Sequence, residues 1–337
     1  MISADQDNAV KRSSLLKRAA PWAVAAAILV YLFLGIDKKL FIDSLKKADL
    51  AVFVPLIMAF ILIWFFIESH NIKKLYSYFG HPARYIDMLK IRGATFLLMI
   101  VNYGLGAGGI ALYMKKFYGI SLLRSTGMLF YYMVVESAGI ALLAAVGFLL
   151  AGSGSGIQHW ILYLSLALFA FYNSELLFLK FMPPLGFLKK FFGSRLLAPL
   201  RQSTIQSYRG IFFLRIGYFL TFVVFFYLAV QAFHMKIPFM DLTALVPIIF
   251  FVGNLPITPF GLGTIQAAML YFFKNYSTEE NILALSILYS VSLLFFRACI
   301  GIYFLKKITE INNLSAGEII QENNTINGNY HDIETIQ

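Results

Sequence analysis

Runs of apolar residues long enough to cross a lipid bilayer constrain this chain more than any motif does. They cover residues 19–35, 50–67, 125–151, 160–179, 211–233 and 282–305. A membrane-spanning helix needs about 20 predominantly apolar residues. The whole chain is 59% hydrophobic and 13% charged, whereas soluble domains average about 45–50% and about 25%. The sequence therefore predicts an all-α polytopic membrane protein and excludes a cytosolic enzyme, a secreted domain and a disordered protein.

The segments outside these runs divide the chain into three parts. Residues 1–18 form a basic N-terminus, 19–307 an integral membrane domain, and 308–337 a polar tail with five acids that we expect to be disordered. Within the membrane domain, residues 36–48 place apolar side chains on one helical face with lysines around them. That pattern favours a short helix lying at the membrane interface.

Two further apolar stretches, about 93–118 and 242–273, are interrupted near their middle. The first contains NYGLGAGG at 102–109, and the second contains GNLPITPFGLG at 253–263. Each half offers about ten apolar residues, half of what a full span requires. We therefore expect two broken hairpins that enter and leave the membrane on the same side.

The distribution of positive charge supports this threading. With both hairpins re-entrant, 21 of the 28 lysines and arginines, including those of the loop 180–210, fall on one side. Cytoplasmic loops carry the excess of Lys and Arg. The prediction is six full transmembrane helices plus two re-entrant hairpins, with both termini cytoplasmic, in the cytoplasmic membrane. The hairpins then enter from opposite sides, as in an inverted repeat, and such interrupted segments point to a transporter's binding site.

The glycines of the first interruption have three possible interpretations. GLGAGG matches the dinucleotide pattern GxGxxG, but no strand precedes it and no acid follows about twenty residues later. Small residues also let two helices pack closely. Four glycines in six residues favour a break beside a cavity instead. The candidate binding residues here are Asn102, Gly104, Gly106 and Gly108.

The second interruption cannot continue a helix, because proline lacks the N–H and clashes with the preceding turn. The freed carbonyls and the N–H groups that open the next helix would line a polar pocket. Since helix N-termini favour anions, a phosphate headgroup fits such a pocket. The candidate binding residues are Asn254, Pro256, Thr258, Pro259, Gly261, Gly263 and Gln266.

Two charged residues lie deep within predicted spans. Glu136 and Arg297 would be costly there unless they face the bundle interior. Arg297 shares a helical face with Ser286, Ser290 and Gly301. We expect Arg297 to hold a lipid phosphate and Glu136 to balance charge or relay a proton; the alternative is a structural ion pair. Glu175 and Arg215 fall near span ends, where we expect them to snorkel to the surface.

The segment PITPFGLGTIQ (256–266) resembles the Pro-x-Ser/Thr-x-Gly-Gly-x-Gly-x-x-Glu hairpin of the lysylphosphatidylglycerol synthase transmembrane-region family. That family includes the flippase half of the multiple peptide resistance factors. The order of the other segments extends the resemblance over roughly 15–307. The chain departs from the pattern at Phe260, at Gln266 in place of the acid, and at Gly109, where the first hairpin usually has Glu.

The resemblance implies flippase-like transport or binding of an anionic phospholipid or lipid-linked sugar. One alternative is a scaffold that docks lipid for a lipid-modifying enzyme. A weaker one is an intramembrane transferase with Glu136 as base, since only Glu136 and Glu175 lie within predicted spans. The five histidines are scattered, Cys299 is the single cysteine, and no P-loop or nucleophile–base pair is visible. We therefore expect no catalytic residues, no metal or cofactor, and no nucleic-acid partner.

Overall fold

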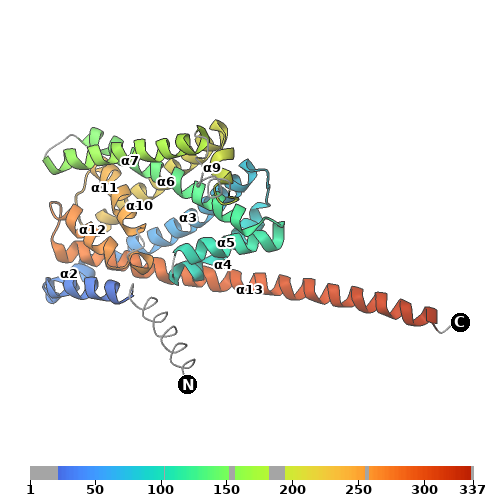
Figure 1. The fold of residues 1–337 in the computed structure, drawn as a ribbon. Coiled ribbons are helices and arrows are strands. Elements are labelled where there is room, and N and C mark those ends of the chain that lie inside the picture. The colour runs from blue at the N-terminus through green and yellow to red at the C-terminus, as the bar shows by residue number, and fades with distance from the viewer. Residues whose placement is uncertain (1–21, 102, 152–155, 182–193, 255–257, 335–337) are drawn as a thin grey trace, which may run out of the picture.

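The computed structural model describes residues 22–101, 103–151, 156–181, 194–254 and 258–334. Within these ranges all regular structure is helical, which confirms the all-α prediction (Figure 1). The helices are α2 (Lys38–Lys47), α3 (Leu50–Tyr78), α4 (Tyr85–Val101), α5 (Tyr103–Tyr118), α6 (Leu122–Ala151), α7 (Gly156–Phe181), α9 (Ala198–Gln202), α10 (Ile205–Ala232), α11 (Phe239–Asn254), η2 (Pro259–Gly261), α12 (Thr264–Phe273) and α13 (Glu279–Glu334).

Four described helices are long and apolar enough to cross a membrane. They are Leu50–Tyr78, Leu122–Ala151, Ile205–Ala232 and Glu279–Ile308, and each contains one of the predicted spans. The other two predicted spans correspond to the shorter apolar helices Trp22–Leu34 and Trp160–Ser174. The chain is therefore a multi-pass helical membrane protein, with four clear spans in its described part.

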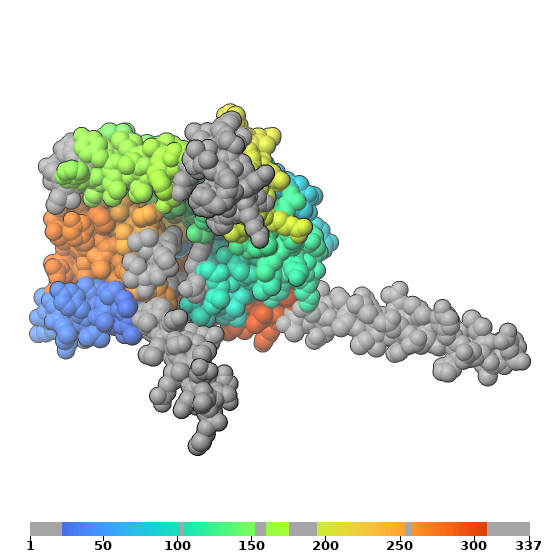
Figure 2. Space-filling view, in the orientation of Figure 1, coloured from blue at the N-terminus to red at the C-terminus, as the bar shows by residue number. Residues whose placement is uncertain are grey.

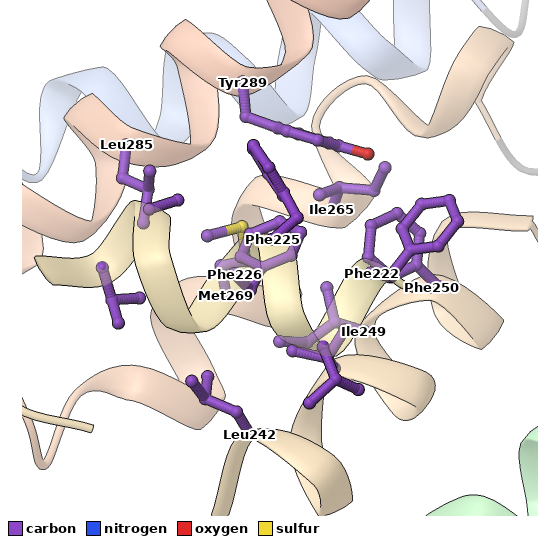
Figure 3. Packing of buried hydrophobic residues seen from close by; sticks show 14 of the residues in the cluster. Phe222, Phe225, Phe226, Leu242, Ile249, Phe250, Ile265, Met269, Leu285 and Tyr289 are labelled. Carbon is purple, nitrogen blue, oxygen red and sulfur yellow. The ribbon is translucent and has the colours of Figure 1, made fainter. Parts of the chain in front are cut away.

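Aromatic packing joins the long helices near the second hairpin (Figure 3). Phe222 and Phe226 of α10 lie 4.6 and 5.7 Å from the ring of Phe250 in α11, and Phe226 lies 5.1 Å from Tyr289 in α13. Edge-to-face ring pairs at such distances stabilise beyond the area they bury. This core fixes α10, α11 and α13 relative to one another.

The predicted interfacial helix is present as α2. The Asp37 carboxylate caps it by accepting hydrogen bonds from the backbone N–H groups of Lys39 and Leu40 at 2.7 and 3.1 Å. In Figure 2, α2 (blue) forms an outer corner of the molecule, and it packs against α13. Its surface position agrees with the amphipathic pattern of the sequence.

The first hairpin consists of two helices, and its glycines do not form the expected break. Helix α4 ends at Val101 and α5 begins at Tyr103, so the expected interruption falls at the start of the motif 102–109, and its glycines lie within α5. A Cβ on Gly106 would lie 2.0 Å from the Met99 Cγ, and one on Gly109 would lie 2.6 Å from Leu98 Cδ1. The glycines therefore let α5 fold back closely along α4, which was the alternative reading of the motif.

The second hairpin is interrupted where the sequence predicts it. Helix α11 ends at Asn254, a single 3₁₀ turn covers 259–261, and α12 begins at Thr264. Gly261 and Gly263 have φ angles of 71° and 85°, a left-handed conformation that glycine adopts without the steric cost of a Cβ. Helix α12 packs against α11, and its Ile265 side chain occupies the space that a side chain at position 253 would need.

Each hairpin is closed at its open end by a tyrosine–aspartate hydrogen bond. The Tyr118 hydroxyl at the end of α5 donates to Asp87 in the first turn of α4 at 2.7 Å. The Tyr276 hydroxyl just after α12 donates to Asp241 in the first turn of α11 at 2.8 Å. The same pair of residue types thus joins the two ends of both hairpins.

The C-terminal segment, which its composition predicts to be disordered, follows the last membrane span directly. Helix α13 continues from the last span to Glu334 and projects beyond the bundle (Figure 1). Extending an existing helix adds one backbone hydrogen bond per ordered residue without a new nucleation cost. No proline lies between 279 and 334 to stop this extension.

Candidate functional site

A cavity of about 320 Å³ lies where the two hairpins meet. Its wall contains Gly104 of α5 and Gly253 of α11, so both interrupted segments contribute to it. Aromatic and aliphatic side chains supply most of the remainder. The other lining residues are Trp64, Arg92, Met99, Ala107, Met133, Glu136, Tyr218, Phe219, Phe222, Phe250, Thr258, Pro259, Gly261, Ile265, Tyr289, Leu293 and Arg297.

Six of the predicted binding residues line this cavity, from four separate stretches of the chain: Gly104, Glu136, Thr258, Pro259, Gly261 and Arg297. Four others, Gly106, Gly108, Gly263 and Gln266, are not in its wall. Asn102, Pro256 and the side chain of Asn254 lie outside the described residues.

Gln266 supports the second hairpin from within the protein. Its Oε1 accepts a hydrogen bond from the Gly263 backbone N–H at 2.7 Å. Its Nε2 donates to the Ser290 hydroxyl at 2.8 Å and to the Ser286 carbonyl at 3.3 Å. The amide is buried, and both its oxygen and its nitrogen form hydrogen bonds. Gln266 therefore joins the start of α12 to α13. Ser286 and Ser290 therefore do face the interior, as the predicted stripe requires.

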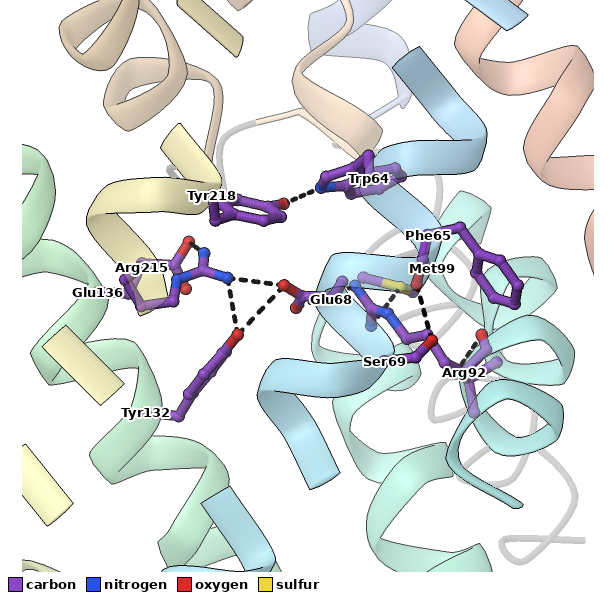
Figure 4. Close-up of polar contacts among 11 residues, drawn as sticks. Trp64, Phe65, Glu68, Ser69, Arg92, Met99, Tyr132, Glu136, Arg215 and Tyr218 are labelled. Carbon is purple, nitrogen blue, oxygen red and sulfur yellow. Dashed lines mark hydrogen bonds and ion pairs between the residues drawn. The ribbon is translucent and has the colours of Figure 1, made fainter. Parts of the chain in front are cut away.

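A cluster of buried charges borders the cavity. Arg215 of α10 donates to Glu68 of α3 at 2.6 Å and to the Tyr132 hydroxyl at 2.7 Å, and forms an ion pair with Glu136 of α6 (Figure 4). Arg92 of α4 donates to the other oxygen of Glu68 at 3.3 Å. The four charged side chains, Glu68, Arg92, Glu136 and Arg215, form what we call the buried ion network. It joins α3, α4, α6 and α10.

The network differs from the sequence-based expectations at three residues. Arg215, predicted to snorkel outward, is only 1% exposed and forms the centre of the network. Arg92, which precedes the predicted hairpin 93–118 by one residue, is buried within α4. Glu68 makes a third intramembrane acid, because α3 extends beyond the predicted end at residue 67. Removing a charge from water is costly unless the charge is paired. The partners of these three residues lie far away in the sequence, so the sequence did not indicate the pairing.

Arg297 lies beside the network on the cavity wall. Its guanidinium carbon is 4.3 Å from the Trp64 ring centre and 5.7 Å from that of Phe96. Cations within about 6 Å of an aromatic face are attracted to it. These contacts hold the arginine at the boundary between the cavity and α3.

The charge balance of the site favours an anion. The buried ion network contains two arginines and two glutamates, and Arg297 adds a third arginine. Among these five described side chains one positive charge is in excess. Electrostatic attraction is strengthened in a dry interior. In the described part of the chain no group of three His, Cys, Asp or Glu side chains is placed to hold a metal ion.

The comparison with known families supports the resemblance seen in the sequence. Residues 19–301 match the model of the family described as "Lysylphosphatidylglycerol synthase TM region". The chain belongs to this family. The match includes both hairpins, the buried ion network and every residue of the cavity wall. No curated protein matches the chain.

Proposed function

We propose that this member of the family binds an anionic phospholipid or lipid-linked sugar in the cavity between its hairpins and moves it across the cytoplasmic membrane. The observation that carries the proposal is the convergence of both hairpins on one cavity whose described wall contains two arginines and one glutamate. Arg297 serves as the phosphate ligand, and Glu136 balances charge. The apolar remainder of the wall accommodates the part of a lipid next to its headgroup.

The proposed membrane arrangement is the re-entrant one, with inverted halves. Helices α4 and α5 contain 17 and 16 residues, which at 1.5 Å per residue gives about 25 Å, short of the roughly 30 Å hydrocarbon core. Helix α12 is shorter still, with 10 residues. The matching tyrosine–aspartate pairs, Tyr118–Asp87 and Tyr276–Asp241, support a repeat.

Cysteine labelling tests this arrangement. In a Cys299→Ala background, Lys116→Cys in the last turn of α5 and Asn275→Cys just after α12 are both at exposed positions. We expect an impermeant maleimide to modify Asn275→Cys in intact cells and Lys116→Cys only after permeabilisation. Labelling of both sites from the same side would contradict the inverted, re-entrant arrangement with cytoplasmic termini.

A lipid-accessibility assay in proteoliposomes tests the function. The full chain is reconstituted with a trace of fluorescent phosphatidylglycerol, and dithionite reports the fraction reachable from outside. We expect the wild type to expose lipid of the inner leaflet, Arg297→Lys to retain part of the rate, and Arg297→Leu to abolish it, since lysine keeps the charge but loses the planar fork. Arg84→Gln is the matched control, because its exposed side chain lies outside the cavity.

Two outcomes would reject transport by this site. An Arg297→Leu rate equal to the wild type would show that the cavity is not the route. Specific binding of the probe without any bilayer exchange would favour the alternative of a lipid-docking partner for a lipid-modifying enzyme.

A further inference from the structure

Arg92 occupies an unusual position for a residue of an ion network. It is 3% exposed, projects from α4, and lines the cavity together with Arg297. Its hydrogen bonds are few: Nη2 reaches Glu68 at 3.3 Å, and Nη1 reaches the Met99 sulfur at 3.1 Å. Its Nε–H is buried with no acceptor among the described residues. A guanidinium has five N–H donors, so the bonding capacity of Arg92 is largely unused.

Arg215, whose Nε–H also has no acceptor among the described residues, differs from Arg92 in the bonds of its terminal nitrogens. It has a carboxylate on each terminal nitrogen, a tyrosine hydroxyl at 2.7 Å, and the Tyr218 ring 3.9 Å from its guanidinium carbon. It is absent from the cavity wall. Glu68 accepts its shorter bond from Arg215 and a further one from Tyr132 at 3.1 Å. Glu68 would therefore keep two donors if Arg92 turned away.

Arg92 and Arg297 approach the same aromatic ring. Their guanidinium carbons lie 5.3 and 5.7 Å from the ring centre of Phe96. Both residues belong to one cavity wall, on α4 and α13 respectively. Two guanidinium groups beside one cavity suit a phosphate, because each can donate two parallel N–H bonds to its oxygens.

We propose that Arg92 is the second phosphate ligand of this cavity, and that it exchanges its long contact with Glu68 for the phosphate of a lipid. This inference rests on the proposed function and names the chemistry of its substrate: a phosphodiester held between Arg92 and Arg297. Glu68 remains paired with Arg215 throughout, so the exchange leaves no buried carboxylate without a partner. The apolar walls near the phosphate, including Phe219, Phe222 and Leu293, favour a lipid over a free phosphate ester.

Binding measured through Trp64 tests the proposal, since this residue lies in the cavity wall. The full chain in detergent, with Trp22→Phe and Trp160→Phe, is titrated with dihexanoyl phosphatidylglycerol and separately with glycerol 3-phosphate. We expect Arg92→Gln to weaken lipid binding by about tenfold or more, and Arg92→Lys to weaken it less. Arg84→Gln, which removes a positive charge just before α4, should bind as the wild type does. Glycerol 3-phosphate should bind at least about tenfold more weakly than the lipid, because it lacks the acyl chains.

The variants separate this inference from the proposed function. Weakened binding in Arg297→Gln with wild-type affinity in Arg92→Gln would overturn the role of Arg92 alone. Wild-type affinity in both would overturn the proposed function. If Arg92→Gln does not fold, Arg92→Lys decides, because it keeps the charge beside Glu68 and loses only the fork; unchanged affinity there overturns the inference. A lowered melting temperature with unchanged affinity identifies a purely structural role and also overturns it. Equal binding of glycerol 3-phosphate would reject a lipid substrate.

Discussion

The two hairpins reach the same cavity by different local means. The first is made of two helices whose close approach depends on glycines at the contact, and Arg92 of this hairpin belongs to the buried ion network. The second is interrupted by prolines and left-handed glycines and is tied to α13 by the neutral amide of Gln266. The difference shows that glycine and proline do not signal the same thing at membrane depth. Glycine permits a close approach, whereas proline removes a backbone hydrogen bond.

The largest expected effect comes from removing the charged anchor of the first hairpin. Glu68→Leu leaves Arg92 and Arg215 without their shared carboxylate, and loss of one partner from a buried pair costs about 3–5 kcal/mol. Denaturant titration in detergent should show this loss. Ser69→Ala is the matched control, because the Ser69 hydroxyl only bonds the Phe65 carbonyl within α3. Equal stability of the two variants would mean that the network contributes little.

Removing Gln266, the neutral anchor of the second hairpin, should lower the free energy of unfolding by a smaller amount. Gln266→Leu leaves the Gly263 N–H and the Ser290 hydroxyl without their amide partner, and a buried polar group left unsatisfied costs about 1–3 kcal/mol. The same titration measures it. Ser286→Ala should change little, since the Ser286 carbonyl still accepts from Gln266. If Gln266→Leu destabilised more than Glu68→Leu, the contrast between the two anchors would be reversed.

Alanine substitutions within the first hairpin test the packing role of its glycines. Gly106→Ala forces a Cβ into Met99 and should destabilise by about 1–3 kcal/mol through overpacking. Gly108→Ala meets nothing within 4 Å and should be neutral or stabilising by up to about 1 kcal/mol, because alanine favours helix. Thermal melting of the two variants measures the difference. Similar losses at both positions would contradict the close-packing interpretation.

The smallest effect concerns the hydrogen bonds that close the hairpins. The pKa of Tyr118 and that of Tyr276 are both raised, so both bonds respond to alkaline pH, and the Tyr118–Asp87 bond responds to acid as well. Burial and the bond to Asp241 raise the pKa of Tyr276 to about 12. Its stabilisation is complete below the ordinary tyrosine value of about 10 and is lost as the pH rises through the raised pKa. Burial tends to raise the pKa of Asp87, but bonds from Tyr118 and Arg84 outweigh it and lower that pKa. Its stabilisation is present above the ordinary aspartate value of about 3.9 and is lost as the pH falls through the lowered pKa.

Phenylalanine substitutions measure these pH dependences. Tyr276→Phe should flatten the alkaline side of a plot of melting temperature against pH, and Tyr118→Phe should flatten both the alkaline and the acidic side. The effects are modest, because the pairs lie near the surface, where water screens charge. An unchanged acidic side in Tyr118→Phe would contradict the contribution of its bond to Asp87.

The features predictable from sequence were local ones. The break after Asn254 follows from the prolines and glycines beside it, and the inward face of α13 follows from the spacing of Ser286, Ser290 and Arg297. The ion network was not predictable in this way. Glu68 and Arg215 lie 147 residues apart, and no periodicity within either segment indicates that they meet. The apolar run ends at residue 67, where hydropathy falls, whereas α3 continues to Tyr78, and its Glu68 and Ser69 side chains find partners inside the protein.

Arg215 also has a mechanical consequence. From α10 it contacts Glu68 of α3 and Glu136 of α6, so three long helices are tied at one point of their length. A tie at a single point resists the sliding of one helix along another, but it permits the helices to tilt about that point. Small rotations there become larger displacements at the helix ends, in opposite directions above and below. In the proposed transport, the arginine would therefore act as a pivot that stays fixed while the two ends of the bundle open and close in turn.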